Sequence, residues 1–453
     1  TISFRQSTRC IKIVLLKSRE HRKVFLLFLE GTKMVTTALK MLFIEKKKAM
    51  SLVFNLAIMI CLSGVMLNML ENPKMQIVYL FINDVANLLS ILYFFLIIIC
   101  IWLVAYSCLY YIRINSREFA LIRLAGYDFL QLVKYMVIQN LMIVLMAAIL
   151  GYLMMVVLIP VVQMIIYSYV GMNYNIFYIS WSAIYQSFLL LLLTTVIMVF
   201  LDIYYINRMS IPEMLKMHNI VSYKTDKRLI KIPKILFVVL YLIGLIILFN
   251  SDDLSFGTIL ICIIGVIGVY GILYYIIPDY LQARIDNKKL KPLDYVVSGN
   301  VSLFLQQAKM IIMLILITVI VFPIVILITS VYPLYHIQVH IIFVLVNVLT
   351  WMTLYSRFKL DFQEKRTLYQ NLYKIGLTTK ELKIVSYKEI ISIFKTILIL
   401  SGVYLTVIIF KLIQANANYY SLVVVLAEYF IPLLICLIWL LNKRGKEIYL
   451  WKK

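Results

Sequence analysis

Long, uncharged runs of apolar residues recur along the chain, and short polar segments separate them. A transmembrane α-helix needs ~20 predominantly apolar residues to cross the hydrocarbon core of a bilayer. Because backbone amides inside lipid must hydrogen-bond within their own segment, each run predicts a membrane-spanning helix and the fold is predicted to be all-α. The runs predict about ten spans, at residues 51–70, 87–112, 135–158, 181–205, 234–250, 257–279, 310–331, 338–356, 390–411 and 420–441.

The connecting segments alternate in charge. Residues 113–134, 208–234 and 357–388 belong to a strongly basic set, whereas the other set holds only Lys74 and Lys411 as bases. Basic connecting segments remain in the cytoplasm, so the alternation predicts a multi-pass protein with the N-terminus and the C-terminus inside.

Composition agrees with a membrane location. The chain is 63% hydrophobic and 14% charged, which leaves too little polar surface for a soluble protein of 453 residues. The formal net charge of +23 does not indicate nucleic-acid binding, because the bases lie in the segments between apolar runs, where they face anionic lipid. Five of the six cysteines fall inside apolar runs and none forms a CxxC pair, so inert buried thiols are expected.

The first residues differ from the rest. Residues 1–33 are basic and are expected to be a non-native or disordered extension, because Glu30–Met34 could be encoded by a ribosome-binding sequence before a start codon. We therefore expect the natural protein to begin at Met34. Residues 34–50 alternate apolar and basic side chains and predict an amphipathic elbow helix along the inner membrane surface.

A repeated hairpin is the most informative motif. The segment REFALIRLAGYD follows the second predicted span, and EKRTLYQNLYKIGLTTKEL follows the eighth. Each predicts a short charged helix, a glycine break and a second helix that returns to the membrane. Gly126 and Gly376 lie 250 residues apart and are predicted to be helix C-caps with positive φ.

This repeat divides the chain. It predicts two four-helix units joined by a two-helix connector. The predicted parts are an extension at 1–33, an elbow at 34–50, a first unit at 51–232 with hairpin 113–134, a connector at 233–308, a second unit at 309–442 with hairpin 357–388, and a basic tail at 443–453.

The two hairpins resemble the cytoplasmic signature of FtsX-like ABC-transporter permeases. The ten-span layout is most similar to the bacitracin-export (Bce-type) permeases of Gram-positive bacteria, over roughly residue 34 to the end. The resemblance implies a bacterial cytoplasmic membrane and an ABC ATPase homodimer as partner. It also implies that the hairpins contact this ATPase, through Arg117, Glu118, Arg123, Gly126, Lys374, Gly376, Lys380 and Glu381.

Two features depart from the Bce-type pattern. The connection between the seventh and eighth spans, about Thr329 to Ile337, is too short for the large extracellular domain of that branch. The family also tends to place a glutamate where the second hairpin returns to the membrane. Glu389 fits this pattern, whereas the first hairpin has Gln139 and Asn140. The two halves are therefore expected to differ in electrostatics.

The sequence shows no chemistry of its own. It has no G-x-x-x-x-G-K-[ST] loop, so ATP and Mg²⁺ are expected on a partner chain and no cofactor on this one. His336 and His340 have the spacing of two metal ligands but no further ligand nearby, so no metal site is predicted. Glu428 lies inside a predicted span, where it is either a contact for a cationic substrate or gate, or a neutral or snorkelling carboxylate.

These features predict a non-enzymatic permease subunit of a bacterial ABC transporter that handles an antimicrobial peptide, for resistance, self-immunity or export. An ion-coupled secondary transporter is the first alternative and would need acidic residues deep in the bundle. A non-transporting subunit that signals to a partner such as a sensor kinase is the second. Membrane lipid and the peptide would be further partners, and nucleic acid would not.

Overall fold

The computed structural model describes residues 42, 46–72, 83–171, 175–208, 210–216, 233–251, 256–286, 292–414 and 419–450. The predicted extension 1–33 and most of the predicted elbow 34–50 lie outside these residues, and residues 46–50 of the elbow are the start of α4. The described part is helical and contains no strand, which confirms the all-α prediction. Its helices are α4 (Lys46–Leu70), α6 (Asn83–Leu124), α7 (Phe129–Val170), α8 (Trp181–Arg208), α9 (Ile211–Lys216), α10 (Lys234–Asn250), α11 (Phe256–Gly271), the π-helical turn η1 (Ile272–Ile276), α12 (Ile277–Asp286), α13 (Pro292–Ile328), the 3₁₀ turn η2 (Thr329–Val331), α14 (Pro333–Glu364), α15 (Arg366–Lys374), α16 (Thr379–Gln414) and α17 (Tyr419–Leu450).

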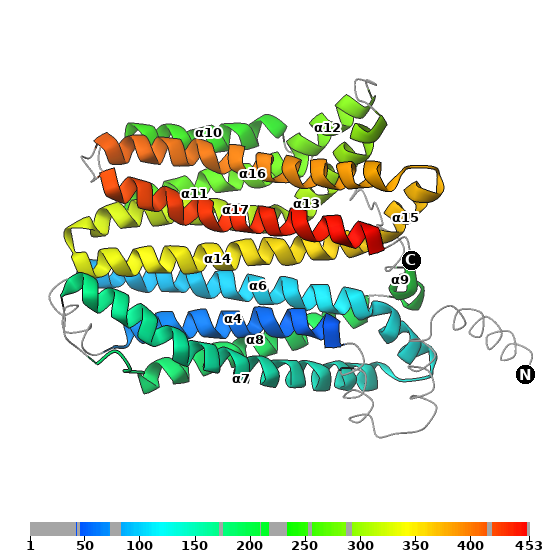
Figure 1. Cartoon of the computed structure of the whole chain (residues 1–453), viewed down its shortest axis with the longest axis horizontal. Coiled ribbons are helices and arrows are strands. Elements are labelled where there is room, and N and C mark those ends of the chain that lie inside the picture. Colours follow the sequence, from blue (N-terminus) through cyan, green and yellow to red (C-terminus); the bar gives the residue numbers. More distant parts are fainter. Residues whose placement is uncertain are drawn as a thin grey trace, which may run out of the picture. The chain divides into compact units, whose positions relative to one another are not determined.

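Nine helices in the described residues are long and apolar enough to cross a membrane. The tenth predicted span, 234–250, coincides with α10, which has 17 residues. At 1.5 Å per residue α10 is about 26 Å long, at the short end of what crosses a bilayer. The chain is therefore a multi-pass membrane protein, and every predicted span is helical in the structure (Figure 1). The span 257–279 is divided among α11, η1 and the start of α12, and the span 310–331 ends in η2.

Several helices extend well beyond the predicted spans. Both α6 and α7 have 42 residues, so each is about 63 Å long and continues outside a bilayer. Residues 292–309, predicted as part of a connecting segment, form the first turns of α13. Pro292 at the first helical position and Asp294 in the first turn favour a helix start there, which the hydropathy pattern does not detect.

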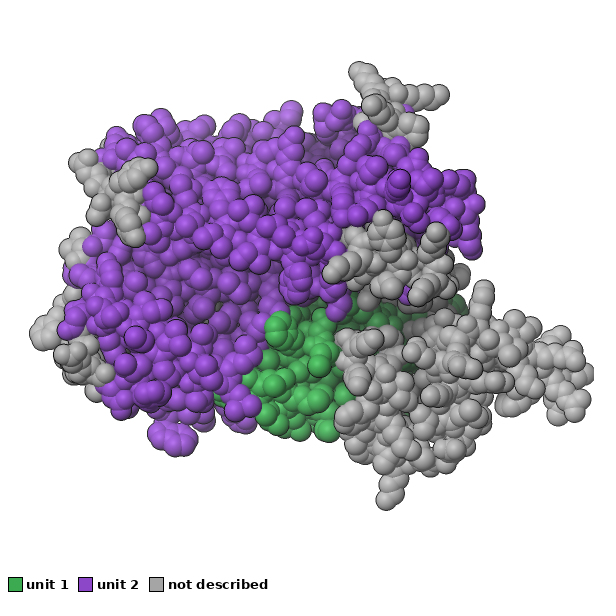
Figure 2. Space-filling model, viewed as in Figure 1, with its two compact units in different colours: residues 1–57, 104–152, 189–222 green, residues 58–103, 153–188, 223–453 purple. Residues whose placement is uncertain are grey.

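The chain divides into two compact units (Figure 2). Unit 1 contains residues 1–57, 104–152 and 189–222, and unit 2 contains residues 58–103, 153–188 and 223–453. In unit 1, polar bonds join the helices inside an apolar core. Asn55 of α4 donates to Ser107 of α6 over 2.8 Å, and Tyr111 of α6 donates to Gln139 of α7 over 3.3 Å.

Unit 2 holds the bundle of α10, α11, α13, α14, α16 and α17, whose axes run nearly parallel in Figure 1. Helices α10 and α11 pack backbone to backbone. A Cβ on Gly268 would lie 2.5 Å from the backbone nitrogen of Tyr241, so only glycine permits this approach. The turn between α13 and α14 runs only from Thr329 to Tyr332, which confirms the predicted short connection.

Candidate functional site

The first hairpin lies in unit 1 between α6 and α7. Helix α6 ends at Leu124, and Gly126 follows with a φ of 95°. The amide of Gly126 donates to the carbonyl of Arg123 over 3.2 Å and closes the helix. Two residues later the amide of Asp128 donates to the side chain of Gln131 over 3.1 Å, one half of a capping box that starts α7.

The second hairpin, in unit 2, repeats this geometry 250 residues later. Helix α15 ends at Lys374, and Gly376 has a φ of 113°. The amide of Gly376 donates to the carbonyl of Tyr373 over 3.1 Å. The capping box of α16 is complete here, because Thr378 donates its amide to Glu381 over 2.8 Å and accepts the amide of Glu381 over 3.3 Å. Both glycines therefore have the predicted positive φ, and the repeat extends to individual hydrogen bonds.

Apolar side chains project from both hairpin tips. Leu124 is 45% exposed and Leu130 is 68% exposed in the first hairpin, and Tyr373 is 48% and Ile375 79% exposed in the second. These residues lie at helix ends, beside the two glycine turns. The sequence alone did not single out these residues, because their exposure depends on the folded surface.

The charged and glycine residues predicted to contact an ATPase divide into three groups. Gly126, Lys374, Gly376 and Lys380 are exposed, and Arg123 is half-buried. Glu118 is buried and Glu381 belongs to the capping box, so both have structural roles within the hairpins. The side chain of Arg117 lies outside the described part. The docking role of the whole set stays a prediction.

A buried ionic network holds the base of the second hairpin. The Lys365 ammonium lies 2.8 Å from Asp361 and 2.5 Å from Glu389, and these three side chains are 3%, 3% and 0% exposed. Burial opposes the charge of Lys365, but the two carboxylates outweigh it and raise the pKa of the ammonium. Tyr369 of α15 donates to Glu389 over 3.0 Å, and Asn300 of α13 over 3.3 Å. The network thus joins α13, α14, α15 and α16.

The equivalent position in the first half is neutral. Gln139, 250 residues before Glu389, donates to the hydroxyl of Tyr135 over 2.9 Å and accepts from Tyr111. Asn140 donates to Asp202 of α8, a fully buried carboxylate that also lies 3.9 Å from the thiol of Cys108. The two hairpins therefore share a backbone geometry but differ in how their bases are held, as the sequence predicted.

The remaining candidate, Glu428 of α17, is paired. His340 Nδ1 of α14 lies 2.9 and 3.0 Å from its two carboxylate oxygens, and the two side chains are 9% and 12% exposed. His336 instead contacts the carbonyl of Ile326 and stacks edge-on against His340. In the described residues no three His, Cys, Asp or Glu side chains form a group that could hold a metal.

Sequence reasoning missed several buried charged residues, among them Asp202, Asp361 and Lys365. Asp361 and Lys365 have the i,i+4 spacing of a helical ion pair, and that signal was visible. They were counted with the solvated charges of the segment 357–388, whereas Lys365 and Asp361 are each 2% exposed. Asp202 lies close to the end of its predicted span and was not singled out.

Comparison with known protein families gives a match in the first half of the chain. Residues 90–211 match the family described as FtsX-like permease C-terminal. This stretch is similar to FtsX-like permeases and is called the FtsX-like segment below. It runs from within α6 to the first residue of α9 and includes the first hairpin, whereas the second hairpin lies beyond the FtsX-like segment. The match supports a permease subunit of an ABC transporter. No curated protein matches the chain.

Proposed function

We propose that this chain is the membrane subunit of a bacterial ABC transporter of the Bce-type layout, driven by a separate ATPase homodimer that binds both hairpins. One observation carries the proposal: two hairpins of the same hydrogen-bonded geometry, one of them inside the FtsX-like segment, present exposed apolar tips beside basic residues. Two equivalent docking elements in one chain suit the two subunits of one ATPase dimer.

The helices supply a route for motion. Helices α6 and α7 leave the first hairpin as helices of 42 residues, α7 with Pro160 well beyond its hairpin end, and α16 leaves the second as a helix of 36 residues. Rigid helices transmit displacement along their length, so closure of the ATPase dimer would move α6 with α7, and α14 with α16. ATP and Mg²⁺ would be bound by the partner, and this chain would contribute no catalytic residue.

The orientation follows from charge. Both hairpins and the basic segments would face the cytoplasm of a bacterium, with the N-terminus and C-terminus also inside. The short α13–α14 turn leaves no room for a large domain at that point, so cargo would enter from within the membrane. An antimicrobial peptide, which is commonly amphipathic, can reach such a site from the bilayer, and resistance, self-immunity or export would each follow.

The partner claim has a direct test. The chain carries a C-terminal tag, is extracted in mild detergent, and its co-purifying proteins are quantified by mass spectrometry. We expect a P-loop ATPase at two copies per permease. A chain that purifies alone from several detergents contradicts the proposal.

The cargo claim is tested separately. Cells with and without the gene are exposed to a panel of cationic antimicrobial peptides, and growth inhibition is measured. Protection that is lost with an ATPase-dead partner supports peptide handling. If cells that contain the assembled complex are as susceptible to the whole panel as cells without the gene, the peptide-handling claim is contradicted. The claim that the chain is a permease subunit is unaffected.

The structure gives little support to the alternative of an ion-coupled secondary transporter. Its best candidate, Glu428, is already paired with His340 and does not line a described cavity. A subunit that signals to a sensor kinase would show ATPase binding without peptide protection, so the two tests together distinguish it from a transporter.

A further inference from the structure

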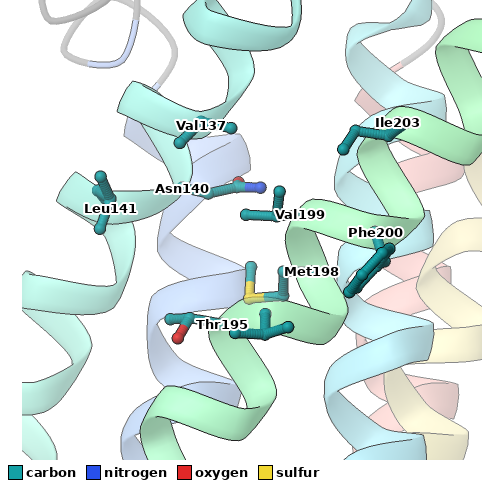
Figure 3. A pocket seen from close by; sticks show the side chains of 9 residues that line it. Val137, Asn140, Leu141, Thr195, Met198, Val199, Phe200 and Ile203 are labelled. Carbon is teal, nitrogen blue, oxygen red and sulfur yellow. The ribbon is translucent and has the colours of Figure 1, made fainter.

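A cavity of about 290 Å³ lies between α7 and α8 within unit 1 (Figure 3). Asn140 points from α7 towards α8, and the walls are otherwise almost entirely apolar. Thr195 is the other polar residue, and its hydroxyl bonds the carbonyls of Leu191 and Leu192. The cavity is lined by Val137, Asn140, Leu141, Thr195, Val196, Met198, Val199, Phe200 and Ile203.

The rim of this cavity faces lipid. Leu141 is 53% exposed, Val196 53% and Phe200 67%, and all three lie in membrane-spanning helices. Exposed apolar side chains in such helices contact the hydrocarbon of the bilayer. An apolar cavity does not hold water, so a hydrocarbon chain is its natural occupant.

Two cations lie at the hairpin end of the same helices. Lys134 precedes Val137 by three residues and Leu141 by seven, which places it on the same face of α7. Arg208 ends α8, five residues after Ile203. Both side chains are exposed. Lys134 has no ion-pair partner in the described part, whereas Arg208 donates to the hydroxyl of Tyr204, one turn earlier on its own face of α8.

We propose that an anionic phospholipid binds here, with one acyl chain in the cavity and its phosphate beside Lys134. A phospholipid has its phosphate at the membrane surface and its acyl chains below. The same order holds along α7, where Lys134 lies about 9 Å before Asn140 of the cavity. Asp202 is fully buried behind Asn140, so its carboxylate is not presented to the phosphate. Binding itself is independent of the proposed function, but assignment to the cytoplasmic leaflet rests on it.

The bound lipid would also act on the first hairpin. Val137 lies eight residues after Phe129, where α7 begins, so an acyl chain between α7 and α8 would hold the hairpin end of α7 in place. Anionic lipid would therefore set how easily this hairpin moves.

Native mass spectrometry of the purified chain tests the proposal. The chain is incubated with phosphatidylglycerol or phosphatidylcholine of identical acyl chains, and the retained lipid is counted. The wild-type chain should retain more phosphatidylglycerol than phosphatidylcholine. The pair Val137→Phe and Val199→Phe fills the cavity and should abolish retention, whereas Val157→Phe, a lipid-facing control 69% exposed on α7, should not.

Head-group binding is tested at the surface, where substitutions do not threaten folding. Lys134→Gln should reduce the preference for phosphatidylglycerol about fivefold, which corresponds to the ~1 kcal/mol that a basic residue contributes near an anionic membrane surface. Lys395→Gln, an exposed lysine of α16, serves as control. The lipid proposal is overturned if the wild-type chain retains both lipids equally, or if retention is unchanged after the cavity is filled. Neither result bears on the proposed binding of an ATPase.

Discussion

Replacing Lys365 with methionine should destabilise the protein by about 3 to 5 kcal/mol, the cost of breaking a buried ion pair from one side. The wild-type network of Asp361, Lys365 and Glu389 carries one positive and two negative groups, all at most 3% exposed. Lys365→Met removes the only counter-charge in it and leaves two buried carboxylates facing each other.

Glu389→Gln provides the matched comparison. Lys365 keeps Asp361 at 2.8 Å, the buried charges then balance, and the amide oxygen still accepts from Tyr369. The stability loss is then that of one charge-assisted hydrogen bond, about 1.5 to 3 kcal/mol. Lys395→Met, at an exposed lysine of the same helix, should change stability by less than about 0.5 kcal/mol.

The buried thiols of the protein supply the assay. Cys61, Cys100, Cys108 and Cys436 are free and buried, so a thiol-reactive dye reaches them as the helices separate on heating. Cys10 and Cys262 are replaced by serine in every protein compared. At one heating rate in one detergent, the unfolding midpoints should fall in the order Lys395→Met, Glu389→Gln, Lys365→Met. A Lys365→Met protein that melts with wild type, or above Glu389→Gln, would refute the electrostatic reasoning.

Three further sets of substitutions test other parts of the account. Gly126→Ala and Gly376→Ala should each cost about 1 to 2 kcal/mol, because their φ angles of 95° and 113° disfavour a Cβ even in open space. The same change at Gly402, a helical glycine with equally open surroundings, should instead stabilise by about 0.5 to 1 kcal/mol in the thiol assay. Asn140→Leu should destabilise more than the double variant Asn140→Leu with Asp202→Leu, because the single change leaves a buried carboxylate without its amide donor; equal melting of the two would contradict the pairing. Glu428→Gln should change the free energy of unfolding by no more than about 1 kcal/mol. If the carboxylate contacts cargo, the same substitution should lower protection against the peptide. Unchanged protection would exclude that role.

Hydropathy and charge alternation located the membrane-spanning helices because both are local properties of the chain. The hairpins were also predictable, since a glycine C-cap followed by Thr378-x-x-Glu381 is a local signal. The ends of the long helices were not, because α13 continues to Pro292 through polar residues that hydropathy treats as a loop.

Side-chain pairing across helices depends on which faces meet, and sequence periodicity alone does not fix this. Glu389 was singled out from the sequence, but its partner Lys365 lies 24 positions away on another element. Glu428 was likewise found, whereas its pairing with His340, 88 positions away, required the packed arrangement of α14 and α17. The exposed apolar tips of the hairpins depend in the same way on the folded surface.

Site-specific photo-crosslinking tests the central claim that the hairpins dock on a separate ATPase. A photoreactive amino acid replaces Ile375, 79% exposed at the second hairpin tip, or Trp181, 84% exposed at the start of α8. After irradiation of intact cells, the crosslinked proteins are identified by mass spectrometry. The account predicts a P-loop ATPase crosslinked at position 375 and not at position 181. No ATPase at position 375, in a chain that folds and reaches the membrane, would contradict it.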